Sequence, residues 1–161
     1  MKYFEDTAIG ERLELGAHQF RADDIKAVAR RFDPQRFHLD EGEAERSHFG
    51  GLCASGWHTG FVWMRMFVEY RNALTKKMRA RGEPVAELGP SPGFQALKWL
   101  RPVYAGDTIS YAMEVVEKRE SKSRPDWGIV QFLVTGTNQR GEPVFTFSSI
   151  NFVERRARRS A

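Results

Sequence analysis

The sequence predicts an α+β domain in which one long buried helix packs against a mostly antiparallel sheet of about five strands. A stretch from about Cys53 to Arg79 is apolar nearly all round in its first half, the pattern of a helix buried on every side. Segments rich in strand-forming residues and separated by turn residues follow it. Strands grouped in this way after the helices are typical of α+β domains.

The first expected elements are an edge strand and a short amphipathic helix. A weak alternation of leucines favours a strand over Arg12–Phe20. Asp23 and Asp24 favour a helix start, because negative charge is stabilised at a helix N-terminus. Apolar residues then recur at helical spacing, at Ile25, Val28, Ala29 and Phe32. Pro34 disfavours helical backbone in the residue before it, so Asp33 is expected to leave the helix for a loop.

Asp40, followed three residues later by Glu43, is typical of a helix cap and predicts a short helix over Glu41–Arg46. Gly50 and Gly51 break it, and the long helix follows.

From Tyr70 onward the long helix turns polar and basic, so its second half is expected to emerge into solvent. The expected strands are Phe94–Leu100, Thr108–Glu117, Gly128–Thr137 and Val144–Val153. In the last of these, Phe145 and Phe147 point to one face by alternation, whereas Ile150 and Phe152 point to the other. A bulge near Ser148-Ser149 would reconcile the two halves, and so would a slip in the assumed register.

Length and charge limit the possible classes of protein. The 161 residues fit one domain, expected over residues 1–154, with a basic tail over residues 155–161. The four arginines of that tail account for the whole net charge of +4. We interpret the tail as a solvated end, because it lacks the aromatic and motif context of a nucleic-acid-binding arm. The N-terminus lacks the apolar core of a signal peptide, and no apolar run reaches the roughly 18 residues of a membrane span. We therefore expect a cytoplasmic protein that binds neither nucleic acid nor membrane.

The candidate catalytic residues lie between residues 32 and 59. Asp33 and His38 lie five residues apart across a loop, and Ser55-Gly56 stands where a buried helix should begin. A proton-transfer pair and a helix N-terminus are both needed by acyl-thioester chemistry. On pattern alone the structural alternatives remain open: Asp33 could start an Asp-Pro turn, and His38 could be a partly buried structural histidine.

A metal site is not expected. The ten-residue gaps between His38, His48 and His58 match no common ligand motif. The single cysteine, Cys53, cannot form an internal disulfide, and we interpret it as a small buried apolar residue rather than a nucleophile.

Three segments carry a family resemblance: FDPQRFHLD at 32–40, FGGLCASG at 49–56 and LKWLRPVYAGDTI at 97–109. They resemble the MaoC-like dehydratases, which include the (R)-specific enoyl-CoA hydratases, and the likeness extends roughly from Tyr3 to Val153. The resemblance implies the hot-dog fold, a long central helix wrapped by an antiparallel sheet. It also implies a homodimer or higher homo-oligomer.

Residue by residue, the resemblance places the catalytic aspartate at Asp33 and the catalytic histidine at His38. It places at Gly56 the glycine whose backbone N–H polarises the thioester carbonyl. Two positions depart from the family pattern. Gln35 stands where many members have asparagine, and Ser55 stands where many have histidine. Both belong to the site lining, so we regard them as candidate substrate-binding residues.

The implied activity is that of a hydro-lyase, which adds water to a 2-enoyl-CoA thioester or removes it from a 3-hydroxyacyl-CoA, with (R) specificity. Coenzyme A enters as part of the acyl-CoA substrate, and no separate cofactor is expected. Lys98 and Arg101 are candidates for its phosphates, although ordinary surface charge explains them equally well.

Two alternatives remain open. A hot-dog thioesterase would use a carboxylate on the long helix, where Glu69 is the only acid of the apolar half. A catalytically inactive acyl-CoA-binding hot-dog protein is the other, and the departures at Gln35 and Ser55 keep it open.

Overall fold

The computed structural model describes residues 1–156 and consists of one sheet, one long helix and a group of short helices. The strands are β1 (Arg12–Gln19), β2 (Gly93–Trp99), β3 (Thr108–Glu120), β4 (Trp127–Asn138) and β5 (Pro143–Glu154). The helices are the 3₁₀ turn η1 (Phe4–Asp6), α1 (Ala22–Phe32), α2 (Arg36–Leu39), α3 (Glu41–Glu45) and α4 (Gly56–Ala80). The sheet has the order β1-β3-β4-β5-β2, and its four pairings are all antiparallel. The predicted fold class is therefore confirmed.

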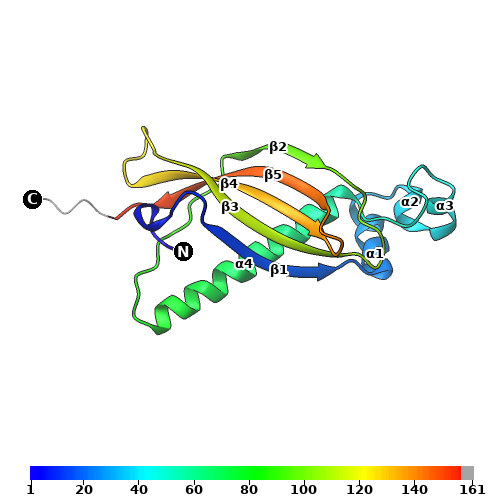
Figure 1. Cartoon of the computed structure of the whole chain (residues 1–161), viewed down its shortest axis with the longest axis horizontal. Coiled ribbons are helices and arrows are strands. Elements are labelled where there is room, and N and C mark those ends of the chain that lie inside the picture. The colour runs from blue at the N-terminus through cyan, green and yellow to red at the C-terminus, as the bar shows by residue number, and fades with distance from the viewer. Residues whose placement is uncertain (157–161) are drawn as a thin grey trace, which may run out of the picture.

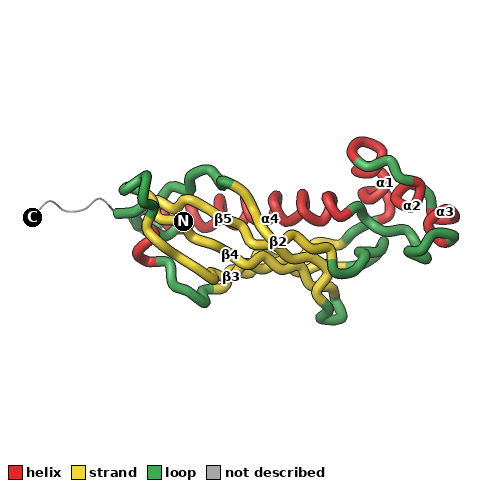
Figure 2. The backbone as a smooth tube through the Cα atoms, turned by 90° about the horizontal axis from the view of Figure 1, so that it is seen from above, coloured by secondary structure: helices red, strands yellow, loops and turns green. Residues whose placement is uncertain are grey.

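The long helix α4 runs along one face of the sheet, and the three short helices gather beyond one end of it (Figure 1). Figure 2, turned by 90°, shows the same separation of α1, α2 and α3 from the sheet. The first turn of α4 therefore lies next to the short helices, which carry the candidate catalytic residues.

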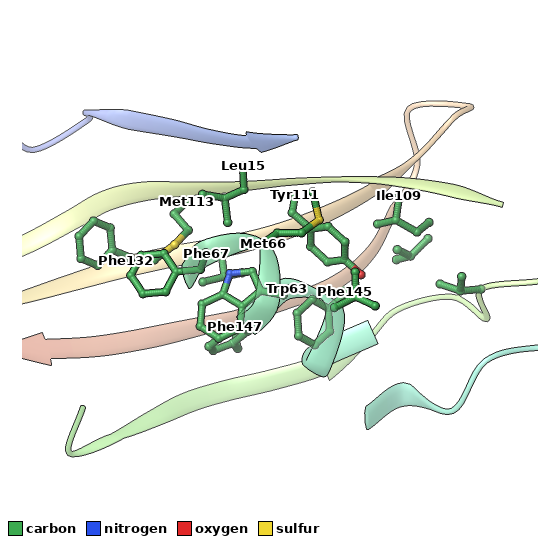
Figure 3. Packing of buried hydrophobic residues seen from close by; sticks show 14 of the residues in the cluster. Leu15, Trp63, Met66, Phe67, Ile109, Tyr111, Met113, Phe132, Phe145 and Phe147 are labelled. Carbon is green, nitrogen blue, oxygen red and sulfur yellow. The ribbon is translucent and has the colours of Figure 1, made fainter. Parts of the chain in front are cut away.

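The hydrophobic core lies between α4 and the inner face of the sheet. Figure 3 shows Trp63, Met66 and Phe67 of α4 facing the sheet. The strands contribute large buried side chains to this core, among them Ile109, Tyr111, Met113, Phe132, Phe145 and Phe147. Alternate residues of β3, β4 and β5 are buried, because successive side chains of a strand point to opposite faces.

The start of α4 differs from the sequence-based expectation. The helix begins at Gly56, so the predicted start near Cys53 was too early. Cys53 instead forms a β-bridge with Tyr104, and the N–H of Ala54 donates to the Val103 carbonyl at 2.8 Å. These partners lie far away in the sequence and hold the chain extended up to Ser55.

Burial of α4 also differs from the expectation. The second half is largely exposed, as predicted. The first half is not buried on every side, because Trp57, Phe61 and Met64 are each about half exposed. These three side chains lie three and four residues apart and so form one apolar stripe along the outside of the helix.

The predicted bulge at Ser148-Ser149 is wrong. Both residues pair in regular register with β4, opposite Leu133 and Phe132. The strand alternates regularly, but two of its inward positions hold polar residues, Ser149 and Asn151, so its large apolar residues there point outward. The Asn151 amide donates to the Ser149 hydroxyl at 2.9 Å.

The bulge instead lies on the neighbouring strand β2, where Ala96 and Leu97 together face Phe147. Ala96 has a φ of 53°, which is unusual for a residue with a side chain. The extra residue reverses the parity of the strand. Phe94 and Trp99 consequently both turn toward the helix side, where Phe94 packs on Phe147 and Trp99 packs on Trp57.

The short helix α3 was predicted almost in full. The Asp40 side chain accepts a hydrogen bond from the Glu43 N–H at 2.9 Å, as expected of a cap. The preceding turn, α2, was expected to be loop and is instead one turn of helix.

At the C-terminus, Arg155 pairs with Glu120 at 2.6 Å, and Arg156 pairs with Asp6 at 2.6 Å. The remaining two arginines of the predicted basic tail, Arg158 and Arg159, lie outside the described residues. Within residues 1–156, no helix is long and apolar enough to cross a membrane.

Candidate active site

Asp33 lies where the chain leaves α1. Its N–H donates to the Ala29 carbonyl at 2.9 Å, which closes the last turn, and its own backbone is no longer helical, with φ −152° and ψ 70°. Pro34 accounts for this break, because a residue before proline is pushed out of the helical region. The break directs the chain into α2, which carries His38.

His38 is buried and hydrogen-bonded through one ring nitrogen. Its Nδ1 lies 2.7 Å from the carbonyl oxygen of Cys53. A carbonyl oxygen only accepts, so Nδ1 carries the hydrogen, and in the neutral ring Nε2 keeps its lone pair. Nε2 lies 3.6 Å from Oδ2 of Asp33. The predicted pair is thus brought together, and Nε2, which donates or accepts no hydrogen bond within residues 1–156, faces the carboxylate.

The Asp33 carboxylate accepts one hydrogen bond on each oxygen. The Ser55 hydroxyl donates to Oδ2 at 2.6 Å, and the Gln35 amide donates to Oδ1 at 2.8 Å. Partial burial acts to raise the pKa of Asp33. The hydrogen bonds from Ser55 and Gln35, together with the charge that His38 can carry, outweigh burial and hold this pKa below its ordinary value.

Gly56 is the first residue of α4, and the N–H groups of a first turn have no partner inside their helix. The helix dipole adds partial positive charge at this point. The indole of Trp99 lies directly over Gly56, since a Cβ built there would come within 2.5 Å of the ring. A side chain at position 56 would force the Trp99 ring to move, which favours glycine there, and Trp99 forms a wall beside the helix start.

A cavity of about 420 Å³ joins these groups. All five residues singled out in the sequence line it: Asp33, Gln35, His38, Ser55 and Gly56. Trp99 and Arg101 also line it, and only Arg101 had been considered from the sequence. No local pattern marks Trp99, because it reaches the site through the bulge of β2.

The other candidates lie away from this chemistry. Glu69 is exposed and pairs with Arg65 at 3.7 Å. It is thirteen residues beyond Gly56 on α4, which corresponds to roughly 20 Å along the helix. Cys53 is buried, and desolvation raises the pKa of its thiol to about 11, which disfavours a nucleophilic thiolate. In the part of the chain that the structure describes, no three His, Cys, Asp or Glu side chains gather as metal ligands.

His58 is a structural histidine of α4. Its ring packs on Phe20 with centroids 5.0 Å apart, and its Nδ1 has no hydrogen-bond partner within residues 1–156. Burial lowers the pKa of His58 to about 4. The folded protein therefore holds this ring neutral at a pH where an exposed histidine would be charged.

This burial predicts a loss of stability in mild acid. Between pH 6.5 and 4 the unfolded chain binds a proton at His58 that the folded chain does not, so the free energy of unfolding falls by up to about 1.4 kcal/mol per pH unit. Urea unfolding of the parent and of His58→Leu from pH 7.5 to 4.5 measures this contribution. The variant should show the shallower dependence on pH, and parallel curves would contradict the assignment.

An apolar groove of about 340 Å³ lies beside α4. It is lined by the half-exposed stripe of that helix and by side chains of β2 and β5: Trp57, Gly60, Phe61, Trp63, Met64, Phe94, Leu97, Phe145 and Phe147. Trp57 lines both this groove and the cavity with Asp33, so the two spaces adjoin.

Comparisons with known proteins agree with this architecture. A family model described as mesaconyl-CoA hydratase matches residues 83–161. The chain is 36% identical to a MaoC-like dehydratase from Rhodospirillum rubrum, with 98% of this chain and 99% of that chain covered and a TM-score of 0.80.

Two more distant structures share the fold. The R-hydratase PhaJ1 from Pseudomonas aeruginosa is 21% identical over 95% of this chain and 86% of its own, with a TM-score of 0.63. A Mycobacterium tuberculosis protein described as a double hotdog fold is 15% identical, with 99% of this chain and 46% of that chain covered and a TM-score of 0.71. These matches confirm the expected hot-dog fold.

Proposed function

This chain belongs to the MaoC-like dehydratase family, and on that premise we propose that it is a hydro-lyase acting on an acyl-CoA thioester. The reaction is the (R)-specific addition of water to a 2-enoyl-CoA, or its reverse. One observation carries the proposal: the free Nε2 of His38 and the carboxylate of Asp33 face one another at 3.6 Å, and both line the cavity that Gly56 of α4 also lines.

The proposed chemistry needs one water in the cavity that hydrogen-bonds to both Asp33 and His38. Asp33 accepts a hydrogen bond from this water, and His38 Nε2 takes one of its protons as the oxygen forms a bond to C3 of the enoyl group. The electrons of the C2–C3 double bond move toward the thioester oxygen and form an enolate. His38 then returns the proton to C2, and the thioester carbonyl re-forms. The sum is one water added, with the enzyme unchanged.

The enolate oxygen requires a donor, and the N–H of Gly56 is suited to that role. It lies at the positive end of a helix dipole and at the wall of the cavity that Asp33 and His38 also line. Trp99 over Gly56 limits the space beside this donor and so helps to set how a flat thioester group approaches it.

We further propose that the apolar groove beside α4 receives the acyl group, because it adjoins the cavity and is lined by apolar side chains. Arg101, which lines the cavity, is a candidate for an anionic group of the substrate, either a phosphate of coenzyme A or a carboxylate on the acyl group. No separate cofactor is needed for this chemistry.

Self-association belongs to the same proposal. Large apolar side chains remain about half exposed around the groove, in particular Phe32, Trp57, Phe61, Met64, Phe94 and Trp99. Four of them line the groove, Phe32 packs on Phe61, and Trp99 packs on Trp57. A continuous surface of this kind marks an interaction site, and we propose that a second copy of the chain covers it to form a homodimer or higher homo-oligomer.

The test is a product analysis with the purified protein. Crotonyl-CoA and mesaconyl-CoA are supplied, loss of the enoyl-thioester absorbance is followed, and free thiol is measured in parallel. We expect the absorbance to fall while the thioester stays intact. Release of free coenzyme A would replace the proposal with a thioesterase, and acyl-CoA binding without turnover of any enoyl-CoA would replace it with a binding protein.

A further inference from the structure

Ser55 and Gln35 both occupy helix N-cap positions, yet neither side chain caps its helix in the described part of the chain. Serine is among the preferred N-cap residues because its oxygen accepts from the helix N–H groups. Here the Ser55 hydroxyl turns away from α4 and donates to Oδ2 of Asp33. Gln35, at the start of α2, donates to the other carboxylate oxygen.

The bond from Ser55 is short and shielded. It measures 2.6 Å, and only 3% of the Ser55 residue surface is exposed. Hydrogen bonds to a charged acceptor are stronger than neutral ones, and little water competes for this one. Ser55 is 22 residues from Asp33 in the sequence, so the contact joins the start of α4 to the end of α1.

The two donors fix how the carboxylate is turned. The terminal torsion of an aspartate is broad, so a carboxylate with a single partner keeps rotational freedom. Because Oδ1 is held by Gln35 and Oδ2 by Ser55, the plane of the Asp33 carboxylate is defined. In this orientation Oδ2 is also the oxygen that faces Nε2 of His38.

We propose that Ser55 and Gln35 are positioning residues that hold the Asp33 carboxylate in the orientation facing His38. This inference deepens the proposed function and rests on it. It replaces the sequence-based hypothesis that the two residues act by binding the substrate. The same hydrogen bonds lower the pKa of Asp33, so Asp33 remains a carboxylate that accepts hydrogen bonds.

The kinetic test separates positioning from substrate binding. Ser55→Ala removes a hydroxyl that caps no helix, and Gln35→Leu removes an amide from an exposed residue, so both variants should fold. Each should lower kcat by on the order of tenfold and leave KM within about twofold. Ser148→Ala, on the opposite face of the sheet from the core, removes an equal hydroxyl and serves as the control. A raised KM with unchanged kcat would overturn the proposal, because it would place these side chains on the substrate.

A double-mutant cycle tests whether Ser55 acts through Asp33. In the Asp33→Asn background, the further change Ser55→Ala should alter the residual kcat by less than about twofold, because the carboxylate that Ser55 holds is gone. A tenfold effect in both backgrounds would overturn the positioning role.

A titration free of turnover completes the test. The carboxyl carbon of Asp33, assigned through Asp33→Asn, is followed by ¹³C NMR against pH in the parent and in Ser55→Ala. The variant should show a raised pKa for Asp33, since one stabilising donor is lost. If no enoyl-CoA is turned over, the proposed function fails, and this titration alone decides the positioning role: an unchanged pKa overturns it.

Discussion

His38→Ala is expected to lower kcat for enoyl-CoA hydration by about 10³-fold and to change KM little, because the variant lacks the only ring nitrogen that faces Asp33 within residues 1–156. Alanine leaves the cavity open to water but removes the group that takes and returns the proton. Single-wavelength assays of enoyl-thioester loss, with enzyme concentration raised to reach the slow variant, measure the effect.

Two variants make this expectation specific. Asp33→Asn keeps the shape of the carboxylate without its charge and should also lose most of the activity. His48→Ala removes the neighbouring histidine, whose ring centroid lies 3.9 Å from that of Phe49, and should keep the parent rate. Circular dichroism verifies folding in each case. Full activity in His38→Ala or Asp33→Asn would mean that the reaction is catalysed elsewhere.

Tyr111→Ala is expected to destabilise the fold by about 4 kcal/mol, the typical cost of the cavity left when alanine replaces a large aromatic side chain in a core. Tyr111 is fully buried on β3 and packs near Phe145, with ring centroids 6.4 Å apart. Its hydroxyl donates to the Thr59 carbonyl at 3.0 Å. The residue therefore joins the middle of the sheet to the first turn of α4.

Tyr111→Phe separates packing from hydrogen bonding. It keeps the ring and loses only the bond to Thr59, so a cost of about 1 kcal/mol is expected. Urea unfolding curves of both variants give the two values. Equal losses in the two variants would show that the hydrogen bond, rather than the volume of the ring, is the dominant contribution.

The fold could be predicted because its elements carry local patterns. Alternation over 109–115 identified β3, and the apolar stretch after Gly56 identified α4. The errors arose where partners distant in the sequence decide the structure. The bridge of Cys53 to Tyr104 delays the start of α4. The regular pairing of Ser149 with Phe132 of β4 excludes the predicted bulge and places Ser149 and Asn151 on the inner face.

The candidate site could also be predicted in part from the sequence. Asp33 and His38 could be found because they lie on one short segment with a recognisable spacing. The hydrogen bond from Ser55 to Asp33 and the position of Trp99 over Gly56 could not be found in this way. Both depend on how α1, α4 and β2 are packed, and no local pattern encodes such packing.

The proton-transfer groups, Asp33 and His38, lie at the end of α1 and in α2, where α1, α2 and α3 extend beyond the sheet (Figure 1). Individual polar contacts hold that region in place. The Tyr104 hydroxyl donates to the Phe49 carbonyl at 2.8 Å, and within the region Lys26 of α1 pairs with Glu41 of α3 at 2.6 Å. Local opening there costs less free energy than breaking the sheet. Amide hydrogens of α2 and α3 will therefore exchange with solvent sooner than those of β3 and β4, and rising urea will abolish catalysis before the sheet unfolds.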